Sequence, residues 1–198
     1  NEIPKEVFGE SFKSNITKGD GNIRKELSEA SNILKKQGWI FENGILVKNG
    51  QKFEFEILLG SSSMEKVLNP FIKNLGKLGI VAKMRIIDEV AYANKVKNFD
   101  YDMTIRNFRV SLSPGNEQKN YWGSEASNIL GSNNYIGIKS PAVDSMINHI
   151  ITAKNRDNLI VAVKALDRIL MNNYYVVPNW YTPVTRVAYW NKFGQPKV

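Results

Sequence analysis

The sequence predicts an α/β fold in which a mixed sheet is flanked by helices, and three observations support this prediction. Strand and helix patterns alternate between residues 53 and 108. The length of 198 residues, of which 42% are hydrophobic, suits one domain that buries its own core. The apolar runs are only a few residues long, whereas a membrane span needs ~20. We therefore expect an irregular lead-in over residues 1–22 and a single α/β lobe over residues 23–198.

The first predicted element is a helix that runs from Ile23 to Gly38. Its apolar residues recur at spacings of four, three and four, so that they share one stripe: Ile23, Leu27, Ala30 and Leu34. Asn22 can cap the start of this helix, and Gly38 can end it. Two Asn-Gly pairs, at 43–44 and 49–50, then favour hairpin turns between short strands.

The middle of the chain predicts three strands joined by two helices. Strands are expected over residues 53–59, 80–87 and 101–108, and helices over residues 67–78 and 90–96. Helical crossovers of this length normally join parallel neighbours in a sheet that has helices packed against it. The pattern therefore predicts a β-α-β-α-β arrangement.

A long segment without clear periodicity, residues 109–140, follows the third predicted strand. A loop of about thirty residues is unusual in a compact domain and is more often functional than idle. Helices are expected after it over residues 142–153 and 156–172. The aromatic and β-branched residues 174–193 then predict one or two final strands.

The residue inventory argues against several classes of site. The chain has no cysteine and a single histidine, His149, so we expect no thiolate site, no zinc site and no nucleophile–histidine triad. We interpret His149 as an ordinary residue of the helix predicted around it. Neither a Gly-rich phosphate loop nor a dinucleotide fingerprint occurs in the sequence. We therefore expect no metal, no cofactor and no catalysis.

Two alternatives stay open at this point. The net charge of +8 arises entirely within residues 61–198, because residues 1–60 hold nine basic and nine acidic side chains. Such an excess is typical of polyanion-binding modules, although the basic residues are scattered and no run exceeds two. Asp100 and Asp102 lie two apart on a predicted strand and so share one face, where they could form the carboxylate pair of a hydrolase.

Polar and aromatic side chains concentrate at the end of the third predicted strand, in the long loop and near the last predicted strand. The carboxyl ends of strands in an open α/β sheet are the usual place for a ligand crevice. Tryptophan and tyrosine offer large contact areas, and arginine and asparagine can pair with carboxylates and peptide groups. The predicted ligand-binding residues are Arg106, Asn107, Phe108, Arg109, Ser111, Asn116, Glu117, Tyr121, Trp122 and Trp180.

Several stretches of the chain resemble the C-terminal lobe of the family 5 extracellular solute-binding proteins, the periplasmic receptors for oligopeptides, dipeptides and nickel chelates. The loop from Ser111 to Ser124 is most similar to the subgroup that serves microcin C-type peptide importers. The resemblance spans about residues 20–190, and the order and spacing of its motifs are fairly specific. The motifs are Leu34-Lys35-Lys36-Gln37-Gly38-Trp39 at the end of the first helix, Phe99-Asp100-Tyr101-Asp102-Met103, the segment from Asn134 to Ile147, and Val176-Val177-Pro178.

The resemblance implies a two-lobed periplasmic receptor that closes on a peptide or modified peptide and delivers it to the permease subunits of an ABC importer. This chain would be the C-terminal lobe of a periplasmic binding protein type II fold, without the remaining lobe and without a signal peptide. We expect no nucleic-acid partner. By analogy with the family, Phe108 would line the cleft, and Asn134 and Tyr135 would lie close to it and bind ligand.

One position departs from the family pattern. In the oligopeptide receptors an aspartate, three residues after an aromatic residue of this loop, binds the amino terminus of the ligand. The corresponding residue here is Ser111, which carries no negative charge. Glu117 is the nearest acidic substitute in sequence, whereas Arg106 or Arg109 could instead favour an anionic group on the ligand.

Overall fold

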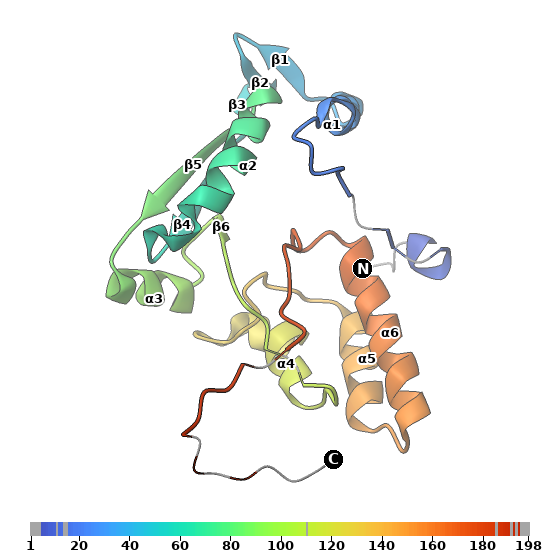
Figure 1. Ribbon diagram of the computed structural model, residues 1–198. Coiled ribbons are helices and arrows are strands. Elements are labelled where there is room, and N and C mark those ends of the chain that lie inside the picture. Colours follow the sequence, from blue (N-terminus) through green and yellow to red (C-terminus); the bar gives the residue numbers. More distant parts are fainter. Residues whose placement is uncertain are drawn as a thin grey trace.

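The computed structural model describes residues 5–10, 12–13, 16–109, 111–184, 186–190, 192 and 194. Figure 1 shows an antiparallel sheet and one helix at the top, a parallel sheet with two helices at the left, and a group of helices at the lower right. We call these the hairpin unit, the sheet unit and the helical unit. The α-helices are α1 Arg24–Lys36, α2 Glu65–Lys77, α3 Glu89–Lys97, α4 Glu117–Trp122, α5 Pro141–Ile151 and α6 Arg156–Asn172. The strands are β1 Ile40–Glu42, β2 Ile45–Lys48, β3 Gln51–Lys52, β4 Glu54–Leu59, β5 Val81–Ile86 and β6 Met103–Thr104, and the 3-10 helices are η1 Lys5–Phe8, η2 Ser62–Met64 and η3 Glu125–Asn128.

The hairpin unit confirms both turns predicted from the Asn-Gly pairs. Asn43, Gly44, Asn49 and Gly50 all have positive φ angles, between 50° and 86°, as the two-residue turns between right-twisted strands require. The strands pair antiparallel in the order β1-β2-β3. The helix α1 leads into this unit, and Ile23 rather than the predicted Asn22 takes its N-cap position, although Oδ1 of Asn22 accepts a hydrogen bond of 3.4 Å from the amide of Arg24, the first residue of the helix.

A close contact joins the hairpin unit to the end of α2. The carbonyl oxygen of Gly79 accepts a hydrogen bond of 2.8 Å from the amide of Leu46. Gly79 has a φ of +81°, and a Cβ at this position would lie 2.6 Å from the ring of Phe41 and 2.9 Å from the amide nitrogen of Leu46. Glycine is therefore required here both by its backbone conformation and by the space available.

The sheet unit confirms the predicted β-α-β-α-β arrangement. Its strands are parallel and lie in the order β5-β4-β6, with β4 in the centre. The core of this unit lies between β4 and α2 and is formed by Ile57, Leu59 and Leu68. The predicted α/β class with helices flanking the sheet is thus confirmed, but in place of one mixed sheet the described residues form two, one antiparallel and one parallel.

The third strand of the sheet unit is shorter than predicted, since β6 covers only two residues of the expected 101–108. The carboxylate of Asp102 accepts a hydrogen bond of 2.9 Å from the amide of Glu56, so a side chain replaces the next main-chain partner of β4. At the other end, β4 stops at Leu59, and the chain beyond β6 has no further strand beside it. Residues 105–109 therefore leave the carboxyl edge of the sheet as a loop.

The helical unit has its own core between α5 and α6. The buried residues are Val7, Ile138, Val143, Ile147, Ile150, Ala162, Leu166 and Ile169. Val7 belongs to η1, so part of the expected irregular lead-in packs on this unit; the division of the chain at residue 22 stays a prediction. Among the described residues, no helix combines the length and the apolar character needed to cross a membrane.

The strands predicted over residues 174–193 are wrong for the part that the structure describes. Residues 174–184, 186–190, 192 and 194 contain no strand, and Figure 1 shows them as an extended path that runs from the end of α6 past α4. Tyr181 is 83% exposed and Trp190 is 78% exposed. A strand needs a neighbour for its backbone hydrogen bonds, and the described residues offer this segment none.

Candidate functional site

The chain passes between the sheet unit and the helical unit directly after β6. Figure 1 shows this segment, which contains α4, running from the carboxyl end of β6 towards α5. The long loop predicted over residues 109–140 thus contains two short helices, α4 and η3. Most of the predicted ligand-binding residues lie in or beside this loop.

Four aromatic side chains meet in this segment, and we call Phe108, Tyr121, Trp122 and Tyr135 the aromatic cluster. The ring of Phe108 lies at its centre, with ring centroids 4.7 Å from Trp122, 5.7 Å from Tyr121 and 6.2 Å from Tyr135. All four rings are partly exposed, so they are neither sealed inside the fold nor free in solvent. Tilted and edge-to-face ring pairs at these distances stabilise one another by about 0.5–1.5 kcal/mol each.

The four rings differ in how much they also serve the core. Trp122 packs against the core of the helical unit, and its indole Nε1 donates a hydrogen bond of 3.1 Å to the side-chain oxygen of Gln118. Tyr121 donates from its hydroxyl to the carbonyl oxygen of Arg109 at 3.0 Å. Of the four rings, Trp122 is therefore the one that also packs on the core of the helical unit.

Arg106 lies against Tyr135 in a fixed orientation. The guanidinium carbon is 4.3 Å from the centroid of the Tyr135 ring, and Nη2 donates a hydrogen bond of 2.6 Å to the Tyr135 hydroxyl. That hydroxyl in turn donates to the side-chain oxygen of Asn133. Burial alone would lower the pKa of Arg106, but the hydroxyls of Tyr92 and Tyr135 raise it, and the net direction is upward. The group is therefore a permanent positive charge.

A second tyrosine holds the backbone of this site. The hydroxyl of Tyr101 donates a hydrogen bond of 2.8 Å to the carbonyl oxygen of Tyr135. Removal from solvent raises the pKa of Tyr101, which keeps its hydroxyl protonated and able to donate. Tyr101 was not among the predicted site residues, because a contact across 34 residues leaves no local pattern in the sequence. Asn133, two residues from Tyr135, was also missed.

Asn134 is placed differently from what the resemblance implies. Its side chain is fully buried, and Nδ2 donates to the carbonyl oxygens of Gly123 and Ile138 at 3.0 and 2.9 Å, while Oδ1 accepts from the amide of Ile138 at 2.9 Å. These three bonds use both donors of the amide group and close the loop around it. No part of Asn134 is left at the surface for a ligand.

Glu117 and Ser111 hold the loop locally. The carboxylate of Glu117 accepts a hydrogen bond of 2.9 Å from the amide of Gly115, and this bond lowers the pKa of Glu117. The hydroxyl of Ser111 accepts a bond of 3.2 Å from the amide of Ser113. The position that carries an aspartate in the oligopeptide receptors is therefore a local turn residue here, and Glu117 is committed to the backbone.

The remaining predicted site residues are exposed. Asn107, Arg109 and Asn116 lie on the surface of the loop. Trp180 is 66% exposed on the C-terminal segment, and within the described part of the chain its ring contacts none of the aromatic cluster. The structure thus brings together Arg106 and the aromatic cluster but leaves Trp180 apart from them.

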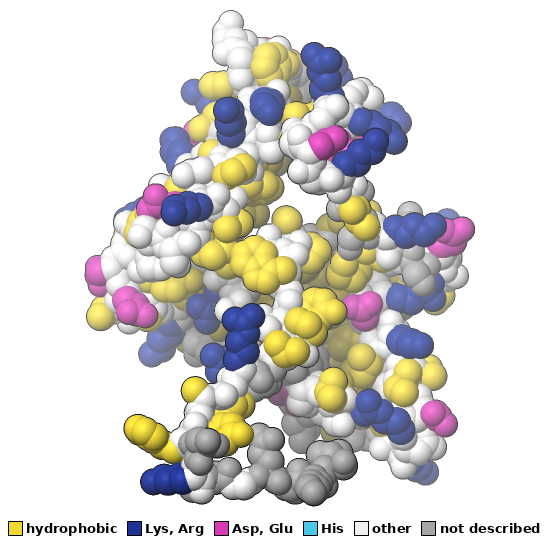
Figure 2. Space-filling model, viewed as in Figure 1, with side chains coloured by type: hydrophobic (Ala, Val, Ile, Leu, Met, Phe, Trp, Pro, Cys, Tyr) yellow, Lys and Arg dark blue, Asp and Glu magenta, His cyan; other side chains and the backbone are white. Residues whose placement is uncertain are grey.

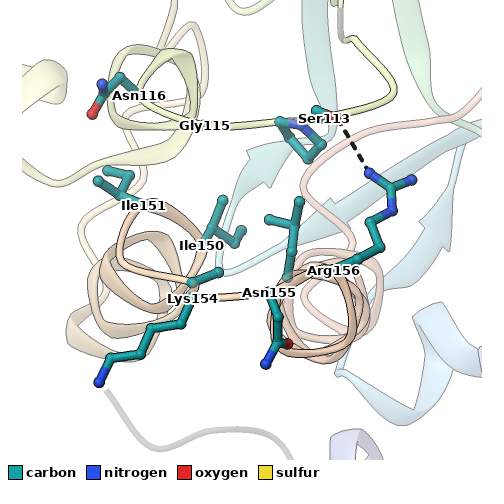
Figure 3. A pocket seen from close by; sticks show the side chains of 11 residues that line it. Ser113, Gly115, Asn116, Ile150, Ile151, Lys154, Asn155 and Arg156 are labelled. Carbon is teal, nitrogen blue, oxygen red and sulfur yellow. Dashed lines mark hydrogen bonds between the residues drawn. The ribbon is translucent and has the colours of Figure 1, made fainter.

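A cavity of about 340 Å³ lies between the loop and the turn that joins α5 to α6. Figure 3 shows Ile150 and Ile151 pointing towards the loop, while Lys154 points away from it. Nη1 of Arg156 donates to the Ser113 hydroxyl at 3.2 Å and to the Leu112 carbonyl oxygen at 3.0 Å, so that this side chain ties the loop to the start of α6. Of the predicted residues only Asn116 lines this cavity.

The carboxylates considered for a hydrolase have other partners. Asp100 forms an ion pair with Lys95, whose hydrogen bond lowers the pKa of Asp100, and Asp102 accepts from the amide of Glu56. His149 is exposed on α5, with Nδ1 2.8 Å from the carbonyl oxygen of Ser145, as expected for an ordinary helix residue. In the part of the chain that the structure describes, no group of three or more histidine or carboxylate side chains could hold a metal ion.

No family model matches the chain. The probable peptide-binding protein YejA of Agrobacterium fabrum is 39% identical over 198 residues, which are 99% of this chain and 32% of that protein. The uncharacterized protein YejA of Escherichia coli K12 is 37% identical over 200 residues, and these cover 100% of this chain and 33% of the relative. The peptidoglycan-binding protein YepA of Agrobacterium fabrum is 33% identical, covering 98% of this chain and 32% of its own length. The chain therefore spans about a third of the length of these relatives.

Two solved structures share the fold. A periplasmic oligopeptide-binding protein from Thermotoga maritima, with mannohexaose bound, superimposes with a TM-score of 0.70 and 20% identity over 90% of this chain and 33% of the other. The oligopeptide-binding protein AppA from Bacillus subtilis, in complex with a nonapeptide, gives a TM-score of 0.65 and 23% identity over 75% of this chain and 30% of the other. The lobe of a type II periplasmic binding protein predicted from the sequence is thereby confirmed, while the assignment to the microcin C-type subgroup stays a prediction. These relatives and the shared fold confirm the resemblance to the family 5 extracellular solute-binding proteins, and the chain corresponds to about one third of the length of such proteins.

Proposed function

We propose that this chain forms part of the cleft in which the substrate-binding component of an ABC importer holds oligopeptides or modified peptides. The observation that carries this proposal is the partly exposed aromatic cluster, with Arg106 beside it, directly beyond the carboxyl end of β6. The complete receptor would reside in the periplasm, hand its cargo to the permease subunits and perform no chemistry. The relative that is 39% identical is named a probable peptide-binding protein, which supports the choice of a peptide as cargo.

The arrangement of the rings suits an extended peptide. Aromatic faces give large contact areas at little cost in side-chain entropy, and the hydroxyls of Tyr121 and Tyr135 add polar groups at the edge of the cluster. Peptide receptors obtain broad specificity when main-chain hydrogen bonds provide affinity and side chains lie in roomy pockets. The loop that carries the cluster is held by Arg156 and Asn134, so the rings are positioned before a ligand arrives.

The exposed surface supports a role for the remaining lobe in closing this cleft. The chain exposes 15041 Å², whereas a folded monomer of 22.5 kDa exposes about 9,500 Å². Figure 2 shows hydrophobic side chains exposed in the middle of the visible face and again along the lower left. We infer that the other two thirds of the receptor cover much of this surface and enclose the ligand against the aromatic cluster.

The proposal is tested by calorimetry on the full-length protein, with trialanine, tetraalanine and pentaalanine as probes and mannohexaose as a comparison. We expect a dissociation constant of about 10 µM or tighter for at least one peptide, and binding weaker than about 1 mM for the 198-residue chain alone. Binding of the saccharide but of no peptide would contradict the proposal. Micromolar binding of peptide by the isolated chain would also contradict the proposal, because that chain should lack about half of the contacts with the ligand.

The polyanion alternative gains no support from the distribution of charge. Figure 2 shows lysine and arginine side chains scattered over the visible face without a continuous stripe. Binding of a DNA duplex that weakens steeply between 50 and 200 mM salt would favour that alternative, because phosphate contacts release counterions. Binding of a net-neutral peptide should change little over the same range.

A further inference from the structure

We propose that Arg106 binds a carboxylate of the cargo, so that the receptor selects peptides with an acidic group at this position in the cleft. This inference rests on the proposed function and adds to it the chemical class of ligand group recognised. Three features of the structure support it: the fixed orientation of the guanidinium, its free donors, and the absence of a described counter-ion.

The orientation of Arg106 is set by a chain of contacts. Tyr101 holds the backbone of Tyr135, Asn133 accepts from the Tyr135 hydroxyl, and that hydroxyl accepts from Nη2 of Arg106. The Tyr135 hydroxyl therefore has both its donor and an acceptor position occupied. The ring of Tyr135 packs against the guanidinium at 4.3 Å. A guanidinium that is held in this way loses little freedom when it binds a ligand.

Most donors of Arg106 stay available. A guanidinium carries five N–H groups; the hydrogen bond to Tyr135 uses one of them and the contact with the Tyr92 hydroxyl a second, so three remain. The side chain is exposed, beside a partly exposed aromatic cluster. The planar fork of N–H groups matches the two oxygens of a carboxylate, which binds more strongly to it than a neutral carbonyl does.

The charge of Arg106 has no acidic partner among the described residues, because none of their ion pairs includes it. Of the five acidic residues from Asp100 to Asp144, four accept hydrogen bonds elsewhere, and Glu125 lies exposed on η3. The four carboxylates and their donors are Asp100 with Lys95, Asp102 with the amide of Glu56, Glu117 with the amide of Gly115, and Asp144 with the amide and hydroxyl of Ser124. The described part of the site thus offers a ligand an uncompensated positive charge.

The carboxylate could be the C-terminus of the peptide or an acidic side chain, and the experiment separates these sources. The full-length protein is titrated with tetraalanine and its C-terminal amide, and with Ala-Glu-Ala-Ala amide and Ala-Gln-Ala-Ala amide. Within at least one pair, the acidic peptide should bind about tenfold or more tightly than its neutral twin. A preference confined to the first pair identifies the C-terminus as the carboxylate that binds, and a preference confined to the second pair identifies the acidic side chain.

The variant Arg106→Gln should reduce that preference to about twofold or less while the neutral twin keeps its affinity within about threefold. Arg106→Lys keeps the charge without the planar fork and should retain part of the preference. Arg24→Gln is the matched control, since it removes the same charge from the exposed surface of α1. An undiminished preference in Arg106→Gln, or equal affinities within both pairs for the unaltered protein, would overturn the inference. The proposed function fails separately, if none of the four peptides binds at all.

Discussion

The helical unit and the C-terminal segment follow each other directly in the chain, yet among the described residues the first has a buried core and the second is largely exposed. Val143 and Ile147 of α5 are 0% and 2% exposed against α6. In the segment after α6, Val187 is 71% exposed and Trp190 is 78% exposed, although the residue types are equally apolar. The difference lies in where each element finds its hydrogen bonds.

A helix satisfies its backbone groups within one segment, whereas a strand needs a neighbouring strand. α6 covers all of the predicted residues 156–172, and the strands predicted over residues 174–193 are missing from the described part. The chain can therefore form its helices from its own residues, whereas the expected strands have no neighbouring strand among the described residues. The aromatic and β-branched character of the segment is consistent with the proposal that a remaining lobe covers it.

The largest expected effect is the loss of core packing in the helical unit. Ile147→Ala should lower the free energy of unfolding by about 2–5 kcal/mol, because a buried cavity replaces the side chain. Val187→Ala should change it by less than about 0.5 kcal/mol in the 198-residue chain, since that side chain is exposed there. Urea unfolding followed by circular dichroism measures both.

The same two variants in the full-length protein test whether the C-terminal segment stays exposed there, in contrast to the helical unit. If the remaining lobe covers the C-terminal segment, Val187→Ala should cost about 1 kcal/mol or more there, because the side chain is then buried. An effect below about 0.5 kcal/mol in both contexts would show that the segment stays exposed at this residue.

A smaller effect is expected at Asn134, where a loop rather than a helix depends on buried hydrogen bonds. Asn134→Ala should destabilise the chain by about 2–3 kcal/mol, because the amide of Ile138 and the carbonyl oxygen of Gly123 lose a partner inside the protein. Asn107→Ala, on the exposed part of the same loop, is the control and should be close to neutral. If both variants unfold at the same urea concentration as the unaltered chain, Asn134 does not hold the loop.

Asn134 also shows how far the sequence can predict the site. The gathering of aromatic and polar residues beyond β6 was predictable, because rings and strand ends are visible in the order of residues. The contact of Arg106 with Tyr135 joins positions 29 residues apart, and no local periodicity encodes it. A sequence pattern likewise cannot distinguish an asparagine that faces a ligand from one that closes a loop, since the same amide group suits both.

The fold was predictable where local sequence signals decide it, and its prediction failed where contacts between distant residues decide it. Apolar stripes and Asn-Gly turns are local signals, and α6 and both hairpin turns are confirmed. The short β6 depends on Asp102, which takes the amide of Glu56 from 46 residues away. Competition between a side chain and the backbone for one partner is decided by tertiary structure, so it could not be read from the strand pattern.

The junction between the hairpin unit and α2 allows a third test, of how much a contact between distant parts of the chain contributes to stability. Gly79→Ala should destabilise by about 2 kcal/mol, since a methyl group would meet Phe41 and Leu46 and the φ of +81° disfavours alanine. Gly137→Ala is a matched control, because its φ is +72° and nothing lies within 4 Å of the added Cβ, so only about 1 kcal/mol of backbone cost should remain. Equal losses in urea unfolding would mean that the contact with the hairpin unit adds nothing.

The smallest expected effect concerns the ion pair of Asp100 with Lys95, five residues away, which is a local contact and so should survive in the isolated chain. The hydrogen bond from Lys95 and its charge lower the pKa of Asp100. The stabilising contribution is therefore present above the unfolded-state pKa of about 3.9 and is lost as the pH falls through the lower pKa of the folded state. Lys95→Met should raise the pKa of Asp100, measured by NMR titration of its carboxyl carbon, whereas Lys97→Met on the same helix should leave it unchanged.

The shift in the pKa of Asp100 should be the same in the 198-residue chain and in the full-length protein, because both partners of the pair lie within a few residues of each other. The effect of Val187→Ala, in contrast, should differ between the two. A shift that appears only in the full-length protein would show that even this contact depends on the parts of the receptor beyond this chain.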